Sequence, residues 1–246
     1  VILIGISMYV QLNLEDTEAF KELQAVKAQR DAESPVKIVR RSPIIEALVK
    51  YPKRIALAAG AFLSIQVAFY ILIGFVLAYG VDVNGAAIPR DTMLFAVLIA
   101  SGVQIPAQFW AAAYSDRHGR RGIFMLGAVL TGAWSFALFP LIDTGQFWLV
   151  VLALSGGLAF LGLMYGPQAA FFTELFSTEV RYSGASLGYQ IGAIVGGAFA
   201  PTIATLLWAE YSIVWVSVYI AFASLLSLIS VRMLTETYKA SLNDVE

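Results

Sequence analysis

The sequence predicts an all-α membrane protein built as a bundle of six transmembrane helices. Hydrophobic residues make up 59% of the 246 residues and charged residues only 13%, whereas a soluble domain carries about a quarter charged residues. Mean hydropathy is +0.75. A hydrocarbon core about 30 Å thick is crossed by roughly 20 apolar residues in a helix. Six runs meet this length, at approximately 55–79, 91–114, 122–142, 147–170, 184–208 and 211–233.

The first apolar run, VILIGISMYVQL, is too short to span a bilayer. It opens without the Met and the basic stretch of a secretory signal peptide. We therefore interpret residues 1–11 as the end of a transmembrane helix that is truncated upstream.

Residues 12–54 form the only sizeable polar segment. The part DTEAFKELQAVKAQRDAE mixes both charges at helical spacing, which is typical of a surface helix. The part SPIIEALVKYPKR predicts a second short helix, with Ser42 as N-cap and Pro43 in the first turn. Its apolar side chains would face the membrane surface and its basic side chains would meet lipid headgroups. The apolar side chains are Ile44, Ile45 and Leu48, and the basic side chains are Lys50, Lys53 and Arg54.

Fifteen of the sixteen Lys and Arg residues lie in connections on one side of the predicted membrane, and only Arg90 lies on the other. The positive-inside rule places the richer side in the cytoplasm. The chain then divides into a truncated helix at 1–11, a cytoplasmic linker at 12–54, the bundle at 55–234 and a cytoplasmic tail at 235–246.

One stretch invites a catalytic interpretation that its context does not support. GASLG matches the G-x-S-x-G pattern around a nucleophilic serine, here Ser186, but that motif needs a strand before it and a general base nearby. The single histidine, His118, could relay protons, but it lies in a polar turn and is expected to be solvated. The chain has no Cys, which excludes disulfides and thiolate metal sites. We expect no enzyme activity, cofactor, metal or nucleic-acid partner.

The same GASLG stretch belongs to a series of small residues with a period of four. A stripe of small residues lets a neighbouring helix approach closely in lipid. The helix-packing positions are Gly184, Gly188, Gly192 and Gly196, continued by Ala200 and Ala204. Pro106 and Pro201 each follow a glycine by four residues, which predicts kinks, or ordinary tolerance of proline in membrane helices.

Three stretches resemble one family of transporters. SDRHGRRGIF resembles the loop signature G-x-x-x-D-R-x-G-R-R of the major facilitator superfamily, with Ala112 in place of its first glycine. ELFSTEVRYSGASLGYQIGAIVGG is similar to the loop between helices ten and eleven in the metabolite:proton symporter branch, which includes shikimate, citrate, 2-oxoglutarate and proline/betaine carriers. ALVKYPKRIALAAG resembles the entry to helix seven. The resemblance implies the C-terminal half of a twelve-helix fold, with two six-helix bundles around a cavity that opens alternately to each side.

The resemblance also implies that the charged hairpin is part of a latch between the two halves at the cytoplasmic side. A five-residue turn containing Gly119 is expected to hold the two flanking helices antiparallel. The alternative is that these charges only anchor the topology. The predicted latch comprises Asp116, Arg117, Gly119, Arg120, Arg121, Glu174 and Arg181.

Substrate-contacting candidates are polar side chains deep within apolar helices, because an unpartnered amide in hydrocarbon costs several kcal/mol. They could instead form hydrogen bonds that only join helices. The candidates are Gln66, Tyr70, Gln104, Gln108, Tyr165, Gln168, Tyr189 and Gln190. No acidic or basic residue lies near the middle of a complete helix, so a coupling carboxylate is expected in the absent N-terminal half.

Together these features predict secondary active transport of a small polar metabolite, an organic acid, by proton symport with alternating access. The alternatives are an osmolyte or zwitterion symporter and a non-transporting receptor or structural bundle. Expected partners are the small-molecule substrate, protons, the missing six-helix half and membrane lipids. The expected location is a bacterial inner membrane, with both ends of the chain in the cytoplasm.

Overall fold

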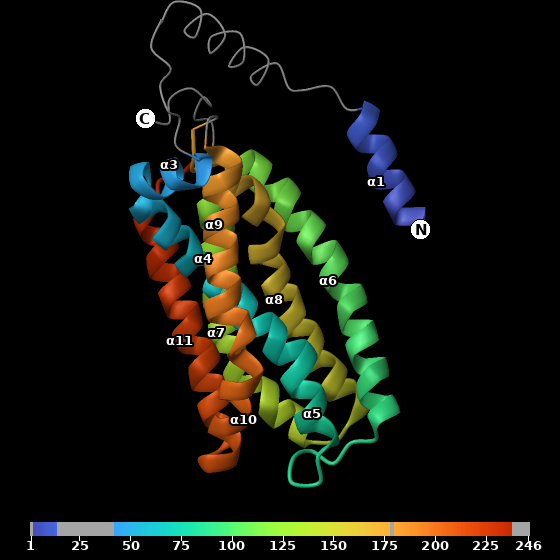
Figure 1. Ribbon diagram of the computed structural model, residues 1–246. Helices are drawn as coiled ribbons and strands as arrows, with labels where there is room; N and C mark the ends of the chain where they lie inside the picture. Colours follow the sequence, from blue (N-terminus) through green and yellow to red (C-terminus); the bar gives the residue numbers. More distant parts are fainter. Residues whose placement is uncertain (1, 14–41, 178–179, 238–246) are drawn as a thin grey trace, which may run out of the picture. The chain divides into compact units, whose positions relative to one another are not determined.

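A computed structural model describes residues 2–13, 42–177 and 180–237 (Figure 1). The chain divides into two units, Val1–Pro43 and Ile44–Glu246. In the first unit, α1 (Ile2–Asn13) exposes large apolar side chains, among them Ile4 and Leu12. The predicted surface helix before residue 42 and most of the predicted tail lie outside the described residues.

Six helices in the described part of the chain are long and apolar enough to cross a membrane, which confirms the predicted all-helical bundle. They begin and end close to the predicted runs, although the last begins two residues later. They are Pro52–Val81, α6 (Arg90–His118), α7 (Arg120–Asp143), α8 (Phe147–Glu174), Arg181–Glu210 and α11 (Ile213–Met233). A short helix, α3 (Pro43–Lys50), precedes the first of them.

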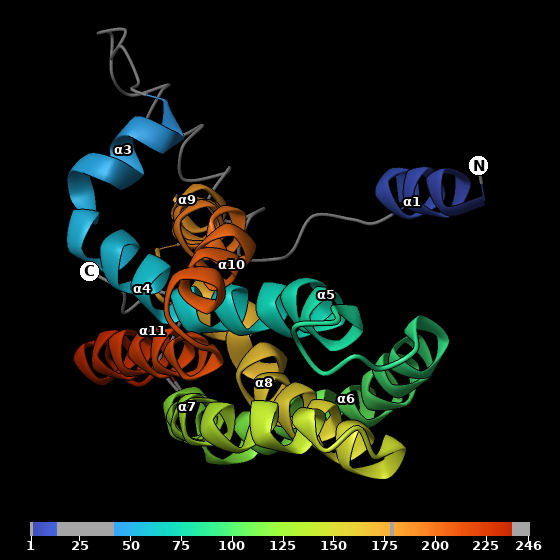
Figure 2. The same ribbon diagram turned by 90° about the horizontal axis from the view of Figure 1, so that it is seen from below.

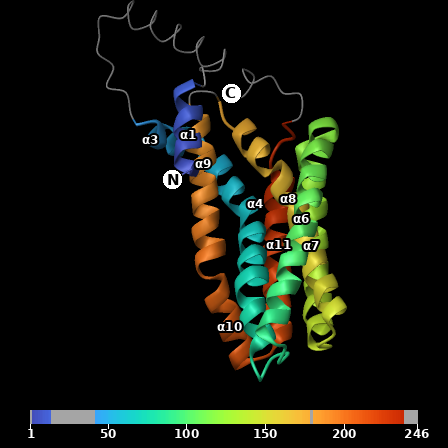
Figure 3. The same ribbon diagram turned by 90° about the vertical axis from the view of Figure 1, so that its right-hand side faces the viewer.

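Two of the six helices contain a π-helical turn. The first span consists of α4 (Pro52–Tyr70), the π-turn η1 (Ile71–Phe75) and α5 (Val76–Val81). The fifth consists of α9 (Arg181–Ala193), the π-turn η2 (Ile194–Ala198) and α10 (Ala200–Glu210) (Figure 3). Pro201 lies in the first turn of α10, so its missing N–H falls where a helix leaves donors unpaired in any case. Pro106, by contrast, lies inside an uninterrupted α6.

The helices pack in an order that differs from their order in the sequence. Along the bundle, α6 packs on α8, α8 on α7, α7 on α11, α11 on α4 and α4 on α9 (Figure 2). The helices α6 and α9 therefore stand at the two ends of this series. Much of the apolar surface of α6 is exposed, including Phe95, Leu98 and Phe109.

Buried serines join α11 to its two neighbours. Ser64 on α4 shares a hydrogen bond of 3.0 Å with the hydroxyl of Ser224, and its backbone N–H donates to Ser227 Oγ at 2.9 Å. Ser135 on α7 and Ser217 on α11 each donate a hydroxyl to the other's backbone carbonyl. In lipid, where apolar burial does not drive helix association, such hydrogen bonds and close packing hold helices together.

Candidate functional site

The charged hairpin is tighter than the sequence predicted. Only Gly119 separates α6 from α7, so the expected five-residue turn is wrong: Asp116 and Arg117 belong to the last turn of α6, and Arg120 begins α7. The reversal is possible because Gly119 has φ of +102°, a conformation that side chains with Cβ rarely adopt. The charges therefore project from two helix ends rather than from a flexible loop.

Arg120 is the centre of this cluster. Its guanidinium forms an ion pair with Asp116 and a second one with Glu174, the last residue of α8, at 3.0 Å between Nη2 and Oε1. Nη1 also donates to the hydroxyl of Ser115 at 3.0 Å. The side chain is only 14% exposed. Charge-assisted hydrogen bonds of this kind are stronger than an exposed ion pair, and they join the ends of α6, α7 and α8.

The segment after α11 completes the cluster, and the sequence interpretation had missed it. The carboxylate of Glu236 accepts the backbone N–H groups of Arg120 and Arg121 at 3.0 and 3.1 Å. It thus satisfies two of the donors that the first turn of α7 leaves unpaired. Thr237 donates its hydroxyl to Glu174. Six helices that alternate in direction bring the end of α11 to the same end of the bundle as the connection between α6 and α7. The sequence could therefore have indicated that residue 236 lies near Arg120.

The remaining arginines of the predicted latch meet backbone carbonyls or solvent. Arg121 donates to the carbonyls of Val231 and Arg232 at the end of α11. Arg181 donates from Nε to the carbonyls of Thr173 and Phe176, at 3.2 and 3.3 Å. Cations interact favourably with the terminal carbonyls of a helix. Arg117 is exposed.

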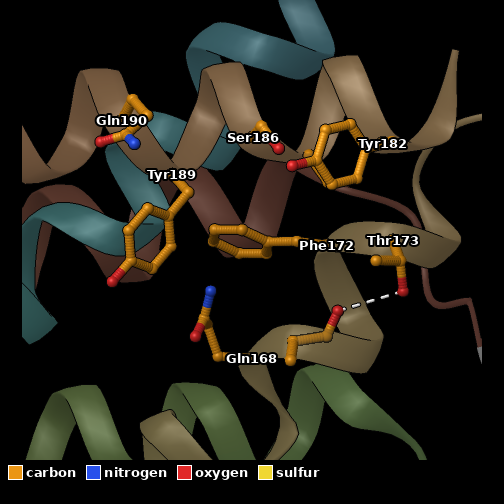
Figure 4. A pocket seen from close by; sticks show the side chains of 9 residues that line it. Gln168, Phe172, Thr173, Tyr182, Ser186, Tyr189 and Gln190 are labelled. Atoms are coloured by element: carbon orange, nitrogen blue, oxygen red, sulfur yellow. Dashed lines mark hydrogen bonds between the residues drawn. The ribbon is translucent and has the colours of Figure 1, made fainter. Parts of the chain in front are cut away.

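A cavity of about 250 Å³ lies between α8 and α9 (Figure 4). Of the eight predicted substrate contacts, Gln168, Tyr189 and Gln190 line it. The full lining is Gln168, Ala169, Phe172, Thr173, Tyr182, Ala185, Ser186, Tyr189 and Gln190. Its polar groups are amides and hydroxyls, with no acidic or basic side chain. The sequence interpretation missed Tyr182 and Thr173 because they lie at the helix ends, outside the apolar runs.

The other five predicted contacts do not line this cavity. Gln66 is 8% exposed and lies against η2, and Tyr70 packs on Gly197, where an added Cβ would lie 2.6 Å from its ring. Tyr165 interacts with Tyr189, which does line the cavity.

Two of these five lie on α6, where it packs closely on α8. The backbone of Gln104 and Gln108 lies 3.4 and 3.3 Å from a Cβ built on Gly162. That Gln66, Gln104 and Gln108 contact substrate stays a prediction.

Three of the four glycines of the predicted stripe lie at close contacts with another helix. A Cβ on Gly188 would lie 2.8 Å from that of Ala58, and one on Gly192 would lie 2.8 Å from the Ala59 carbonyl. A Cβ on Gly196 would lie 2.9 Å from the Leu63 carbonyl, so three of the four positions face α4. Gly184 instead packs against the ring of Phe176.

No group of three or more His, Asp or Glu in the described segments could hold a metal ion. The exposed ring of His118 stacks on Tyr114 at 4.3 Å, in the last turns of α6. Ser186 lines the cavity together with amides, hydroxyls and aromatic rings. The arrangement suits reversible binding of a polar molecule by neutral hydrogen bonds rather than covalent chemistry.

Similarity to known proteins shows the family of this chain. The family described as "Sugar (and other) transporter" matches residues 11–246. The chain belongs to this transporter family, within the major facilitator superfamily. The six-helix bundle fits one half of that superfamily's twelve-helix fold.

Proteins similar to this chain have names that describe transport. The inner membrane metabolite transport protein YhjE of Escherichia coli (strain K12) is 32% identical over 98% of this chain and 53% of its own length. The shikimate transporter of the same strain is 28% identical over 98% of this chain and 53% of its own length. The citrate-proton symporter of Klebsiella pneumoniae is 31% identical over 59% of this chain and 32% of its own. The chain thus spans about half the length of the first two.

Proposed function

We propose that this chain forms one wall of a secondary active transporter that carries a small organic acid together with protons. The single observation that carries the proposal is the cavity between α8 and α9, in a bundle of the transporter family. Gln168 is 6% exposed and lines that cavity, so its amide can exchange hydrogen bonds with a ligand. Amides and hydroxyls both donate and accept, and they bind carboxylate oxygens without fixing a charge in the membrane.

The partner half would supply the opposite wall and the charged groups. The cavity lining described above holds no acidic or basic side chain, so a coupling carboxylate and a cation for the substrate would come from the other bundle. A zwitterionic osmolyte is the second candidate, since a neutral wall suits a substrate with no net charge. Substrate identity then depends on where the other wall places its charges.

The charged cluster at Gly119 would act as the conformational latch at the cytoplasmic end. Arg120 holds three helix ends through Asp116 and Glu174, and the segment after α11 caps α7. Contacts of this kind favour one packing of the bundle and must break in the other. The proposed topology places residues 12–54 and 235–246 in the cytoplasm and residues 55–234 across a bacterial inner membrane.

Uptake by the full-length protein in proteoliposomes tests the proposal. Radiolabelled organic acids and betaines are offered with and without a pH gradient, acidic outside. Accumulation of an acid that collapses with the gradient supports proton symport. Accumulation of a betaine alone would favour the second candidate, and no gradient-driven uptake of any polar metabolite would contradict both.

The cavity has its own test in Gln168→Ala. Loss of one neutral hydrogen bond costs about 0.5–1.5 kcal/mol, so the apparent affinity should fall about two- to tenfold while folding stays normal. Gln146→Ala is the matched control, because Gln146 is exposed and precedes α8 at the opposite end of that helix. Unchanged affinity in Gln168→Ala with a lowered melting temperature would show that the amide only joins helices.

A further inference from the structure

The short helix α3 presents an apolar face that its own bundle does not cover. Ile44, Ile45, Leu48 and Val49 are 50%, 50%, 44% and 62% exposed. Ala47 on the other side is fully buried. With 3.6 residues per turn, the four exposed side chains fall within an arc of about 140° on one side of the helix. The helix α3 therefore presents its apolar face away from the bundle, and it contacts the bundle through Ala47 on its other side.

The orientation of α3 is fixed by the corner that follows it. Pro52 has no N–H to continue the helix, and the chain breaks at Tyr51 before α4 begins. The backbone N–H of Tyr51 still donates to the carbonyl of Ala47, and the N–H of Ile55 donates to the carbonyl of Tyr51. Figures 1 and 2 show that α3 runs across the end of the bundle rather than along it.

The corner is also anchored to the segment between α8 and α9. The buried Tyr51 donates its hydroxyl to Ser177 Oγ at 3.2 Å, and its ring packs edge-on against Phe176. The guanidinium of Arg54 lies over the Tyr51 ring and donates to the carbonyl of Leu175 at 3.2 Å. These contacts hold the apolar face of α3 in one direction, at the level where α4 starts its membrane span.

Charge complementarity indicates what covers this face. Lys50 and Lys53 are exposed at the corner, and the only acidic residue from 44 to 54 is Glu46. Apolar side chains beside lysines are the pattern of a helix that lies in the interface of an anionic membrane. Each lysine near such a surface contributes about fivefold to partitioning.

We propose that α3 lies in the membrane interface and binds an anionic lipid surface, with its four apolar side chains among the acyl chains and Lys50 and Lys53 at the headgroups. Through Tyr51 and Arg54, the same surface holds residues 175–177 in place. This inference is independent of the transport reaction, because it concerns only where α3 lies.

Site-directed labelling of the full-length protein, free of other Cys, tests the proposal in vesicles. An environment-sensitive fluorophore is attached to Leu48→Cys or Val49→Cys, with Glu46→Cys as the matched control on the same helix. The vesicles contain phosphatidylcholine with or without about 30% phosphatidylglycerol, and lipids that carry a nitroxide high on the acyl chain serve as quencher. Size-exclusion profiles establish that each labelled protein is folded.

Lipid quenching at residues 48 and 49 should exceed that at residue 46 by about twofold in anionic vesicles. The excess should shrink in phosphatidylcholine alone and in the Lys50→Gln/Lys53→Gln variant. Probes at 48 and 49 that are quenched by aqueous iodide and not by lipid would overturn the proposal. Probes protected from both quenchers would overturn it too, since protein would then cover the face. Quenching independent of lipid charge would overturn the anionic preference.

Discussion

The two ends of the bundle are held together by different chemistry. At the Gly119 end, Arg120 pairs with Asp116 and Glu174, and Glu236 caps the start of α7. At the opposite end, packed aromatic rings and a hydrogen bond between Tyr79 and Asp143 join the helices. There Phe75, Tyr79, Phe139 and Trp208 pack with ring centroids 5.1 to 6.2 Å apart, and the Tyr79 hydroxyl donates to Asp143 Oδ1 at 2.6 Å.

This difference suggests that the charged end can open during transport while the aromatic end stays closed. The Asp116–Arg120 pair loses little when it breaks, because Asp116 is 63% exposed and water replaces its lost partner. The pair with Glu174 is less exposed and loses more. Water cannot replace the contacts between packed rings, so opening them to water costs more. We therefore expect the aromatic end to move as one body and the charged end to rearrange.

The aromatic end should show the largest loss of stability. Phe139 is 1% exposed and touches Phe75 and Tyr79, so Phe139→Ala should lower the free energy of unfolding by about 3–5 kcal/mol. Phe136→Ala, at a side chain on α7 that is 49% exposed, is the control and should be mild. Thermal unfolding in detergent measures both. An equal loss of stability in the two variants would contradict the proposal that this end is rigid.

Arg120→Ala should have a smaller effect on stability and a larger one on transport. The change leaves Glu174 and Ser115 without their cation, at a cost of about 1.5–3 kcal/mol. It should also abolish most uptake, because the cluster then fails to hold one packing. Arg117→Ala is the matched control on the same hairpin, since Arg117 is exposed. Normal uptake with Arg120→Ala would show that the cluster is not a latch.

Tyr79→Phe keeps the ring and removes only the hydrogen bond to Asp143. The expected loss of stability is about 1 kcal/mol, with uptake near normal, because the packed rings remain. The melting temperature and the uptake rate are both measured. A loss as large as that of Phe139→Ala would mean that the hydrogen bond, not the packing, holds this end.

Asp116→Asn should have the smallest effect on stability and still slow transport. Asp116 is 63% exposed, so losing its ion pair with Arg120 should cost about 0.2–1 kcal/mol. Because the shape is kept, expression should be near normal while uptake falls. Uptake at the wild-type rate in this variant would show that the charges of the hairpin only anchor the topology.

Sequence alone predicted the six spanning helices because long apolar runs have few structural choices. In lipid every backbone polar group must be paired within the chain, so an apolar run of about 20 residues forms a helix. The glycine stripe from Gly184 was likewise readable, since the absence of Cβ every four residues marks one helix face. The motif around Asp116 could also be recognised from the sequence, because its residues are adjacent along the chain. It located the charged end of the bundle.

Tertiary structure decided everything that depends on residues far apart in the sequence. Nothing in the sequence indicated that the backbone N–H of Arg120 donates to the carboxylate of Glu236, 116 residues away. Nor did it show that only Gln168, Tyr189 and Gln190 among eight candidates would line one cavity. Helical periodicity determines which face of a helix a side chain occupies, whereas the packing order of the helices determines what that face meets.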